Sequence, residues 1–334
     1  MSRQFFASAI VFAALLASAP AVDGYLKIGT LLGGRLVEVR FNTFPIRYFI
    51  TNRDVPGVPA PQLQQAVERG FASWAAIPNL GVSSQFAGLT AINPVSGDNT
   101  NVIGFSNRPD LDRVLGSTSF TVDTVTGEVL ESDIFLNSSS SFSWSVSAAG
   151  VAGSQDVESI ALHEIGHLLG LGHSMIGETE LISGGRRVLA AESVMFPIAF
   201  SAGSLNRVLR ADDIAGMSDI YGNQEFRSST GSISGRVTKN GAGVTGAHVT
   251  AFHPATGKLV ATFTLDADGT FVIAGLDPGQ QIVRAEPLDD AEASSFLDAS
   301  FKVDTDFKVA FYNRLVTVPR GGTAQNVDLK VVPK

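Results

Sequence analysis

Three of the five histidines of this 334-residue chain fall within residues 163–173, which read HEIGHLLGLGH. His163 and His167 are four residues apart, a spacing that places two side chains on one face of an α-helix. Gly170 then permits the left-handed backbone that ends a helix, so the chain can turn back and bring His173 beside the other two. Three imidazoles that converge in this way are the ligand set of a catalytic zinc ion, with the fourth position left open.

Glu164 lies directly beside the first of these predicted ligands. A carboxylate in that position can take a proton from a water molecule as it attacks a peptide carbonyl and pass it to the leaving amine. The motif therefore predicts zinc-dependent hydrolysis of peptide bonds, with Glu164 as the general base. The alternative is an ordinary amphipathic helix with surface histidines, which the glycine and the third histidine at fixed spacing disfavour.

The composition of the chain narrows the function classes. The formal net charge is -8 at pH 7, so the basic surface of a nucleic-acid-binding protein is missing and we expect no nucleic-acid partner. The chain contains no cysteine, which excludes disulfides, thiolate metal ligands and a cysteine nucleophile. Hydrophobic residues make up 44% and charged residues 17%, a balance typical of a folded globular protein.

The N-terminus has the pattern of a secretory signal peptide. Arg3 supplies a positive charge, residues 5–17 are apolar apart from one serine, and Ala19-Pro20-Ala21 is a small-x-small cleavage signal. The alternative is a membrane anchor, but the apolar run is shorter than the ~20 residues that a spanning helix needs. We therefore expect a signal peptide over residues 1–21, no membrane anchor, and secretion to the extracellular space or a periplasm.

Apolar periodicity predicts helices and strands before Gly222. The helices are expected at residues 61–74, 154–170 and 212–221, and the strands at residues 44–50, 115–122 and 128–137. Ser154 is the predicted N-cap of the helix that carries the histidines, and Gly170 is its predicted end. Residues 87–112 are rich in Gly, Asn, Pro and Asp and are expected to form a long loop.

The pattern changes after Gly222. Residues 222–232 are polar and predict a flexible connection, and beyond them short alternating runs are separated by turn pairs such as Asn240-Gly241 and Asp268-Gly269. This spacing predicts an all-β sandwich of about a hundred residues. We expect a catalytic domain over residues 22–224, a linker over residues 225–231 and a sandwich domain over residues 232–334.

Residues 163–173, followed by Ser174, resemble the zinc signature of the metzincin metalloproteases in its matrixin form. Residues 193–197 (SVMFP) resemble the Met-turn of that family, and residues 209–222 resemble its closing helix. The resemblance implies an α+β zincin fold with a twisted mixed sheet and an active-site helix, and it implies that Met195 lies beneath the zinc. It also implies a protein or peptide substrate that adds as a strand along an edge strand within residues 115–122.

The chain departs from the animal members of this family in its regulation and its metals. Their propeptide carries a cysteine that blocks the zinc, and this chain has none, so it is closer to the bacterial members. No histidine precedes His163, so we expect one catalytic zinc and no second, structural zinc. Calcium is a possible second metal at Asp123 and Asp133, although aspartates at such positions also serve as caps of turns.

The segment between the third histidine and the Met-turn is unusually long for a matrixin. His173 and Met195 are 22 residues apart in sequence number. We expect residues 177–189 to form an inserted loop beside the pocket for the substrate residue that follows the cut.

The C-terminal part resembles a carboxypeptidase regulatory-like domain, a transthyretin-like sandwich, over SGRVTKNGAGVTGAHVTAF and the turn-rich segment that follows it. His248 and His253 lie in it, and their alternating pattern indicates strand side chains and not metal ligands. Such a domain serves stability, adhesion or substrate docking, and these roles remain open. No oligomeric state is predicted.

Two other functions stay open beside the endopeptidase. One is a non-catalytic adhesion or binding protein built on a protease fold, which is disfavoured because the three histidines and Glu164 are all present. The other is a zinc enzyme that acts on a different bond, such as an amidase. An edge strand beside the site would favour an extended peptide substrate over it.

Overall fold

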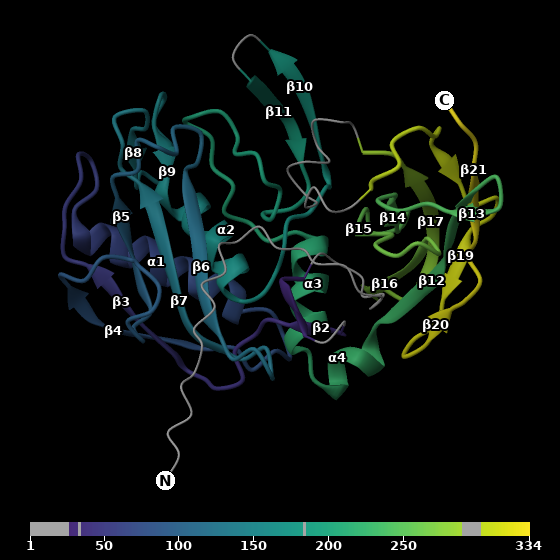
Figure 1. Cartoon of the computed structure of the whole chain (residues 1–334), viewed down its shortest axis with the longest axis horizontal. Coiled ribbons are helices and arrows are strands. Elements are labelled where there is room, and N and C mark those ends of the chain that lie inside the picture. Colours follow the sequence, from purple (N-terminus) through teal and green to yellow (C-terminus); the bar gives the residue numbers. More distant parts are fainter. Residues whose placement is uncertain (1–26, 33–34, 183–184, 289–301) are drawn as a thin grey trace.

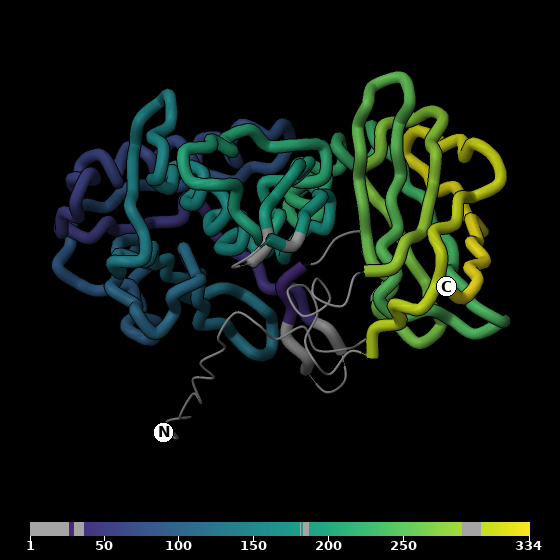
Figure 2. The backbone as a smooth tube through the Cα atoms, turned by 90° about the horizontal axis from the view of Figure 1, so that it is seen from above, coloured from purple at the N-terminus to yellow at the C-terminus, as the bar shows by residue number. Residues whose placement is uncertain are grey.

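The computed structural model describes residues 27–32, 35–182, 185–288 and 302–334, so the predicted signal peptide lies outside the described residues. Two regions follow each other along the chain (Figure 1). The first combines a sheet with helices, and the second consists of strands. Figure 2 shows the same two regions side by side when the molecule is seen from above.

The N-terminal region is built on a mixed five-stranded sheet with the order β4-β3-β5-β7-β6. Its strands are β3 (Ile46–Thr51), β4 (Ser84–Thr90), β5 (Val102–Ser106), β6 (Gly116–Val122) and β7 (Val129–Asn137). The first four strands of this order run parallel, and β6 pairs antiparallel with β7 at one edge. The predicted α+β fold is confirmed, and the strand expected within residues 115–122 is the edge strand.

Helices α1 (Ala60–Ala75) and α2 (Val157–Leu168) cover one face of this sheet, since α1 contacts β3, α2 contacts β6 and β7, and the two helices contact each other (Figure 1). The apolar side chains of α1 recur every three or four residues, and Leu63, Val67 and Trp74 are all buried. Trp74 also donates its indole N–H to the Leu162 carbonyl at 2.9 Å. The core of the region therefore fixes the position of the helix that carries the histidines.

The loop prediction for residues 87–112 was wrong in part. It contains the end of β4 and the whole of β5, whose first four residues are buried. A parallel strand that is buried on both faces shows no alternation of apolar and polar residues. The surrounding Gly, Asn and Pro residues therefore dominated the pattern.

Two carboxylates on β7 hold the loop that leads into β5. Glu131 accepts hydrogen bonds from the backbone N–H of Gly97 at 2.7 Å and of Asn99 at 2.9 Å, and Asp133 accepts one from Val102 at 2.8 Å. Asp123 caps the β6–β7 turn by accepting from Val125 at 2.7 Å. Both aspartates considered for calcium thus bond to backbone N–H groups, and calcium binding stays a prediction.

Three further strand pairs complete the N-terminal region. They are β1 (Gly29–Leu32) with β2 (Arg35–Glu38), β8 (Trp144–Ser145) with β9 (Gln155–Asp156), and β10 (Gly177–Ile182) with β11 (Gly185–Ala191). The last pair projects from the top of the molecule in Figure 1. The segment predicted to be an inserted loop is therefore an antiparallel hairpin.

Helix α3 (Ala211–Tyr221) closes the N-terminal region, and helix α4 (Gln224–Ser229) follows it directly. Most of the segment predicted to be a flexible linker is thus helical. The side chain of Asn223 caps α4 by accepting hydrogen bonds from Glu225 at 2.9 Å and Phe226 at 3.2 Å. The polar composition that suggested a linker is that of a short exposed helix.

The C-terminal region consists of two sheets that enclose one apolar core. One sheet contains β12 (Gly231–Lys239), β13 (Ala242–Gly243), β16 (Thr270–Leu276), β20 (Thr323–Ala324) and β21 (Leu329–Val331). The other contains β14 (His248–Phe252), β15 (Leu259–Phe263), β17 (Gly279–Glu286), β18 (Ala310–Phe311) and β19 (Val316–Val318). The predicted all-β sandwich is confirmed. His248 is a buried strand residue whose Nδ1 lies 2.9 Å from a carboxylate oxygen of Glu286.

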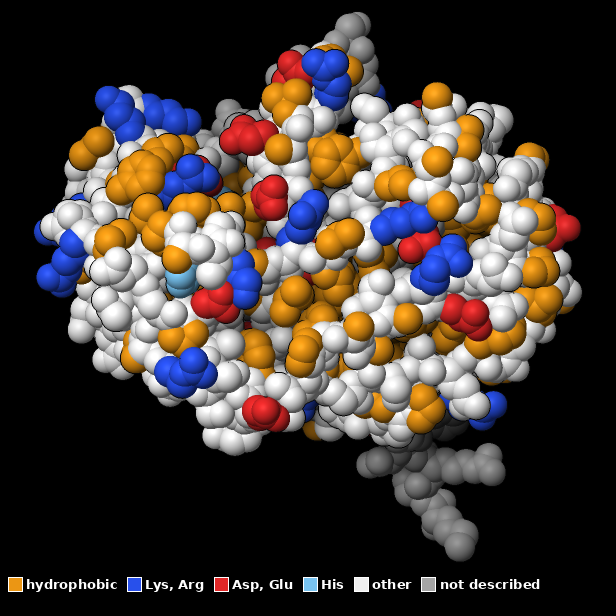
Figure 3. All heavy atoms as spheres, turned by 180° about the vertical axis from the view of Figure 1, so that it is seen from behind, with side chains coloured by type: hydrophobic (Ala, Val, Ile, Leu, Met, Phe, Trp, Pro, Cys, Tyr) orange, Lys and Arg blue, Asp and Glu red, His pale blue; other side chains and the backbone are white. Residues whose placement is uncertain are grey.

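Charged side chains of both signs are scattered over the face seen from behind, and no continuous basic surface forms on the described residues of that face (Figure 3). Within the described residues, no helix combines the length and the apolar character that crossing a membrane requires.

The buried carboxyl group of Asp133 makes stability depend on pH. Burial raises its pKa from 3.8 to about 8, and the nearby Glu131 adds to the shift. Because the folded chain holds this proton while the unfolded chain releases it above pH 3.8, the contribution to stability falls as pH rises towards about 8. We predict that Asp133→Asn, which cannot titrate, gains stability over the wild type by at most about 1.4 kcal/mol per pH unit in this interval.

Urea unfolding of both proteins between pH 5 and pH 8 measures this difference. Curves of free energy against pH that run parallel for the two proteins would contradict the assignment.

Candidate metal centre

The helix α2 presents two histidines on one face. It begins after Asp156, whose carboxylate accepts a hydrogen bond from the Ser159 N–H at 2.9 Å, and not after Ser154 as predicted. The ring centroids of His163 and His167 lie 4.7 Å apart with an interplanar angle of 89°. The spacing of four residues thus places the two rings next to each other, as the sequence predicted.

Gly170 reverses the chain after the helix. It has a φ of 100°, and a Cβ atom at this position would lie 2.4 Å from the carbonyl oxygen of Val39. Both the left-handed backbone and the close approach require glycine. The chain then returns along the helix end, where Leu171 donates its N–H to the Gly166 carbonyl at 3.0 Å, and His173 follows.

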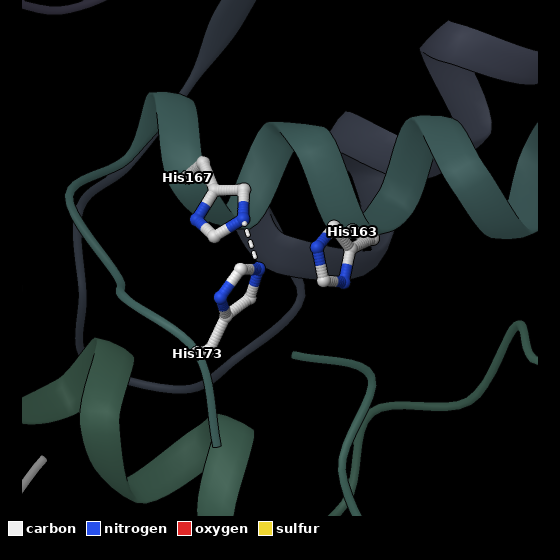
Figure 4. Close-up of side chains that lie close together, drawn as sticks. All are labelled: His163, His167 and His173. Carbon is white, nitrogen blue, oxygen red and sulfur yellow. Dashed lines mark hydrogen bonds between the residues drawn. The ribbon is translucent and has the colours of Figure 1, made fainter. Parts of the chain in front are cut away.

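The three histidines converge on one point. One nitrogen from each of His163, His167 and His173 lies within 4.8 Å of the others, and the three rings face each other (Figure 4). The Nε2 atoms of His167 and His173 are 3.2 Å apart. A tetrahedral ion at about 2.0–2.1 Å from each nitrogen separates its ligands by about 3.3 Å, so the spacing fits zinc.

Hydrogen bonds set the tautomers of the two helical histidines. The Nδ1 atom of His163 lies 2.8 Å from the Val194 carbonyl oxygen, and that of His167 lies 2.7 Å from the Leu171 carbonyl oxygen. Because a carbonyl oxygen only accepts, both Nδ1 atoms carry the proton, and both Nε2 atoms keep a lone pair for a metal.

The same two histidines are held neutral. Burial lowers the pKa of His163, with the Val194 hydrogen bond acting in the opposite direction. Burial also lowers the pKa of His167 well below its usual value, and the neighbouring His163 and His173 add to the shift. Neutral imidazoles are the form that binds a metal cation, so the site is prepared for one.

Glu164 is buried beside this cluster, under the edge strand β6. Its Oε2 atom accepts a hydrogen bond from the Thr118 hydroxyl at 2.7 Å, and a Cβ atom on Gly116 would lie 2.8 Å from its Oε1 atom. Burial raises the pKa of Glu164 to about 7, and the Thr118 hydrogen bond opposes that shift. A carboxyl group with a pKa near neutrality can both take and return a proton in a catalytic cycle.

Met195 supports the helix from below. A Cβ atom on Gly166 would lie 2.3 Å from the Met195 sulfur, so the thioether packs against the backbone between the two helical histidines. The turn that carries Met195 is held by Asp213 of α3. That carboxylate accepts hydrogen bonds from the Ser193 hydroxyl at 2.5 Å and from the Val194 N–H at 2.9 Å.

The structure thus brings together all the residues that the sequence predicted for the site, and it adds Thr118 and Asp213. Thr118 lies on a strand far from the motif in sequence, and no local pattern marked it. Asp213 lies in the first turn of α3, where an acidic residue is already favourable for the helix dipole. Its second role, to hold the turn of Met195, depends on tertiary structure.

A helix with two histidines four residues apart, a glycine reversal, a third histidine and a methionine turn beneath them define a metal-dependent endopeptidase of the metzincin class. Comparison with known proteins specifies the family. A family model described as Matrixin matches residues 40–222, and one described as a carboxypeptidase regulatory-like domain matches residues 232–330. The chain therefore belongs to the matrixin family of metalloendopeptidases, with the histidine triad intact.

Curated relatives include two plant proteins. The chain is 28% identical to Metalloendoproteinase 5-MMP of Arabidopsis thaliana over 239 residues, which cover 66% of this chain and 59% of that protein. It is 38% identical to Metalloendoproteinase 2-MMP of the same plant over 81 residues, which cover 24% of this chain and 18% of that protein. The alignments span less than two thirds of the length of either relative.

Among solved structures, the Bacillus anthracis TIE protein is similar over 31% of this chain and 17% of that one, with 19% identity and a TM-score of 0.19. A TM-score this low supports no argument about fold or function.

The reversal at Gly170 provides a test of the site geometry. We predict that Gly170→Ala lowers both the zinc content and the free energy of unfolding, because the new methyl group meets the Val39 carbonyl as well as the left-handed backbone. Gly81 is a matched control, since it has a φ of 70° and open space around its Cβ position. Gly81→Ala should lose only about 1–2 kcal/mol, the backbone term, and keep its zinc.

Metal analysis and urea unfolding of both variants make the comparison. Equal effects of the two substitutions would show that the contact at Gly170 is unimportant.

Proposed function

We propose that the protein is a zinc-dependent endopeptidase in which Glu164 is the general base towards water. The observation that carries this proposal is the convergence of three imidazoles, two of them with free Nε2 lone pairs, beside a buried carboxyl group with a pKa near neutrality. His163, His167 and His173 would hold the metal. When bound, zinc supplies Lewis acidity that activates water and polarises a peptide carbonyl.

The chain's own residues handle the proton. Glu164 takes a proton from the attacking water and delivers it to the amine that leaves, so its carboxylate and carboxylic acid forms must both be accessible. Burial raises its pKa to about 7, which keeps the two forms balanced near neutral pH. The Thr118 hydroxyl, 2.7 Å from Oε2, holds the carboxyl group and leaves Oε1 for water.

The substrate class follows from the edge strand. β6 is the last strand of the sheet, and among the described residues no strand pairs with its side away from β7. Glu164 lies under this strand, as its contacts with Thr118 and Gly116 indicate. An extended peptide that adds to β6 would pass the proton-transferring group, which favours a protein or peptide substrate over a small amide.

Removal of the general base tests the mechanism. Glu164→Ala is expected to retain about one zinc per chain and to lose at least about a hundredfold in the rate of cleavage of casein or of a quenched peptide library. His173→Ala is expected to lose zinc as well, because two imidazoles bind the ion more weakly than three. Glu225→Ala, an exposed residue of α4, serves as the control.

A rate in Glu164→Ala equal to that of the wild type would exclude this residue as the base. A wild-type protein that binds zinc tightly yet cleaves no peptide would favour a binding function.

We also propose that the protein is exported, because residues 1–21 have a positive start, an apolar run and a small-x-small cleavage signal. Expression of the full chain in a bacterium that secretes proteins should yield a mature form in the periplasm or medium. Its mass should correspond to cleavage after Ala21. An uncleaved chain recovered from the membrane fraction would instead indicate an anchor.

A further inference from the structure

The carboxylate of Asp212 connects the predicted third zinc ligand to the C-terminal domain. Asp212 is the second residue of α3 and is buried. One of its oxygens accepts a hydrogen bond from the Ser174 hydroxyl at 2.6 Å, and the other accepts one from the backbone N–H of Ala261 at 2.8 Å. Ser174 directly follows His173, and Ala261 lies on β15, so a single side chain joins the two.

The donor in the C-terminal domain is an edge N–H group. β15 is the last strand of the sheet order β15-β14-β17-β18, and Ala261 lies opposite Thr250 of β14. Since the N–H of Ala261 points to Asp212, it takes no part in the ladder with β14. An edge strand that would otherwise present unpaired N–H groups is thus paired in part by a carboxylate of the catalytic domain.

An apolar cluster reinforces this connection. Phe263, two residues further along β15, is buried together with Met175 and Phe196. Met175 lies two residues after His173, and Phe196 directly follows Met195. A side chain from the C-terminal domain therefore packs against both ends of the segment that joins the third histidine to the methionine turn.

Helix α3 belongs to the cores of both domains. Met217 and Ile220 are part of the apolar core of the catalytic domain, whereas Ala215 is part of the core of the sandwich. A Cβ atom on Gly275 of β16 would lie 2.9 Å from the Cβ atom of Ala215, so the sandwich approaches the helix backbone closely. Contact of this kind holds Asp212 at a fixed distance from β15.

We propose that β15 is a positioning element of the metal centre: through Asp212 it holds the segment of His173 and Ser174 in place, so that retention of zinc depends on the C-terminal domain. Asp212 is the positioning residue. The inference rests on the proposed function, because it takes His173 as a zinc ligand. It assigns to the sandwich a role within the site, where a tethered accessory domain would have none.

The test removes the N–H of Ala261 in the full-length protein. Ala261→Pro deletes the donor to Asp212 and leaves the ladder between β15 and β14 intact, because proline is tolerated where an edge N–H faces away from the sheet. Leu259→Pro is the matched control, since Leu259 lies two residues earlier on β15 and its N–H faces the same edge. The measured quantities are the rate of zinc transfer to a coloured chelator and the urea midpoint of unfolding.

Ala261→Pro is expected to release zinc about tenfold faster than the wild type, in line with the effect of losing a partner that orients a metal ligand. Leu259→Pro should release zinc within about twofold of the wild-type rate, although both prolines lower the urea midpoint to a similar extent. Equal zinc release from the two variants would overturn the proposal.

Ser174→Ala provides a second measurement that avoids any change in the sandwich. It removes the hydroxyl that Asp212 binds on the side of the ligand and is also expected to release zinc about tenfold faster. Combined with Ala261→Pro, it should add little, because both changes break the same connection. A rate in Ser174→Ala equal to that of the wild type, or full additivity in the double variant, would contradict the inference.

His173→Ala separates this inference from the proposed function. If that variant retains zinc as well as the wild type does, the assignment of the third ligand fails, and the inference fails with it. If His173→Ala loses zinc while Ala261→Pro and Ser174→Ala keep the wild-type rate, only the role of β15 is wrong.

Discussion

The reversal of the chain at Gly170 is the constraint on which the site depends. A single straight helix offers two histidines on one face, and a third imidazole must come from a chain that leaves the helix and returns within a few residues. The φ of 100° at Gly170 and the close approach of Val39 make this return possible. The same reversal places the Leu171 carbonyl where it accepts the Nδ1 proton of His167. One backbone conformation therefore determines both the direction of His173 and the tautomer of His167.

The elements that could be predicted from the sequence are those that bury one face. α1 and the β6–β7 hairpin show the helical and alternating periods because solvent covers their other face. β5 is buried on both sides, carries no such period and was missed. The N-cap of α2 was placed at Ser154 although Asp156 holds the position. Both residue types form caps, and the choice depends on Arg207, whose guanidinium binds Asp156 from a distant loop.

The candidate site was more predictable than the fold because its residues are local. The three histidines and Glu164 lie within eleven residues of sequence, so helix geometry and one turn bring them together. The residues that orient them are distant. Thr118 comes from the edge strand, and Asp213 comes from a helix that follows the long hairpin. Two adjacent acids at the start of α3 also have a sufficient local explanation in the helix dipole, which conceals their tertiary partners.

The absence of cysteine gives the shared helix a particular importance. Without disulfides, the relative position of two domains depends on the surfaces that they bury against each other. Here α3 contributes Met217 to one core and Ala215 to the other, and Asp213 on the same helix holds the turn of Met195. A rotation of the sandwich that moved Ala215 would also move the first turn of α3, and with it the backbone that supports the histidines. The two family matches therefore describe two units of sequence whose cores meet in one helix, and the metal centre lies on the part of the chain that both cores hold.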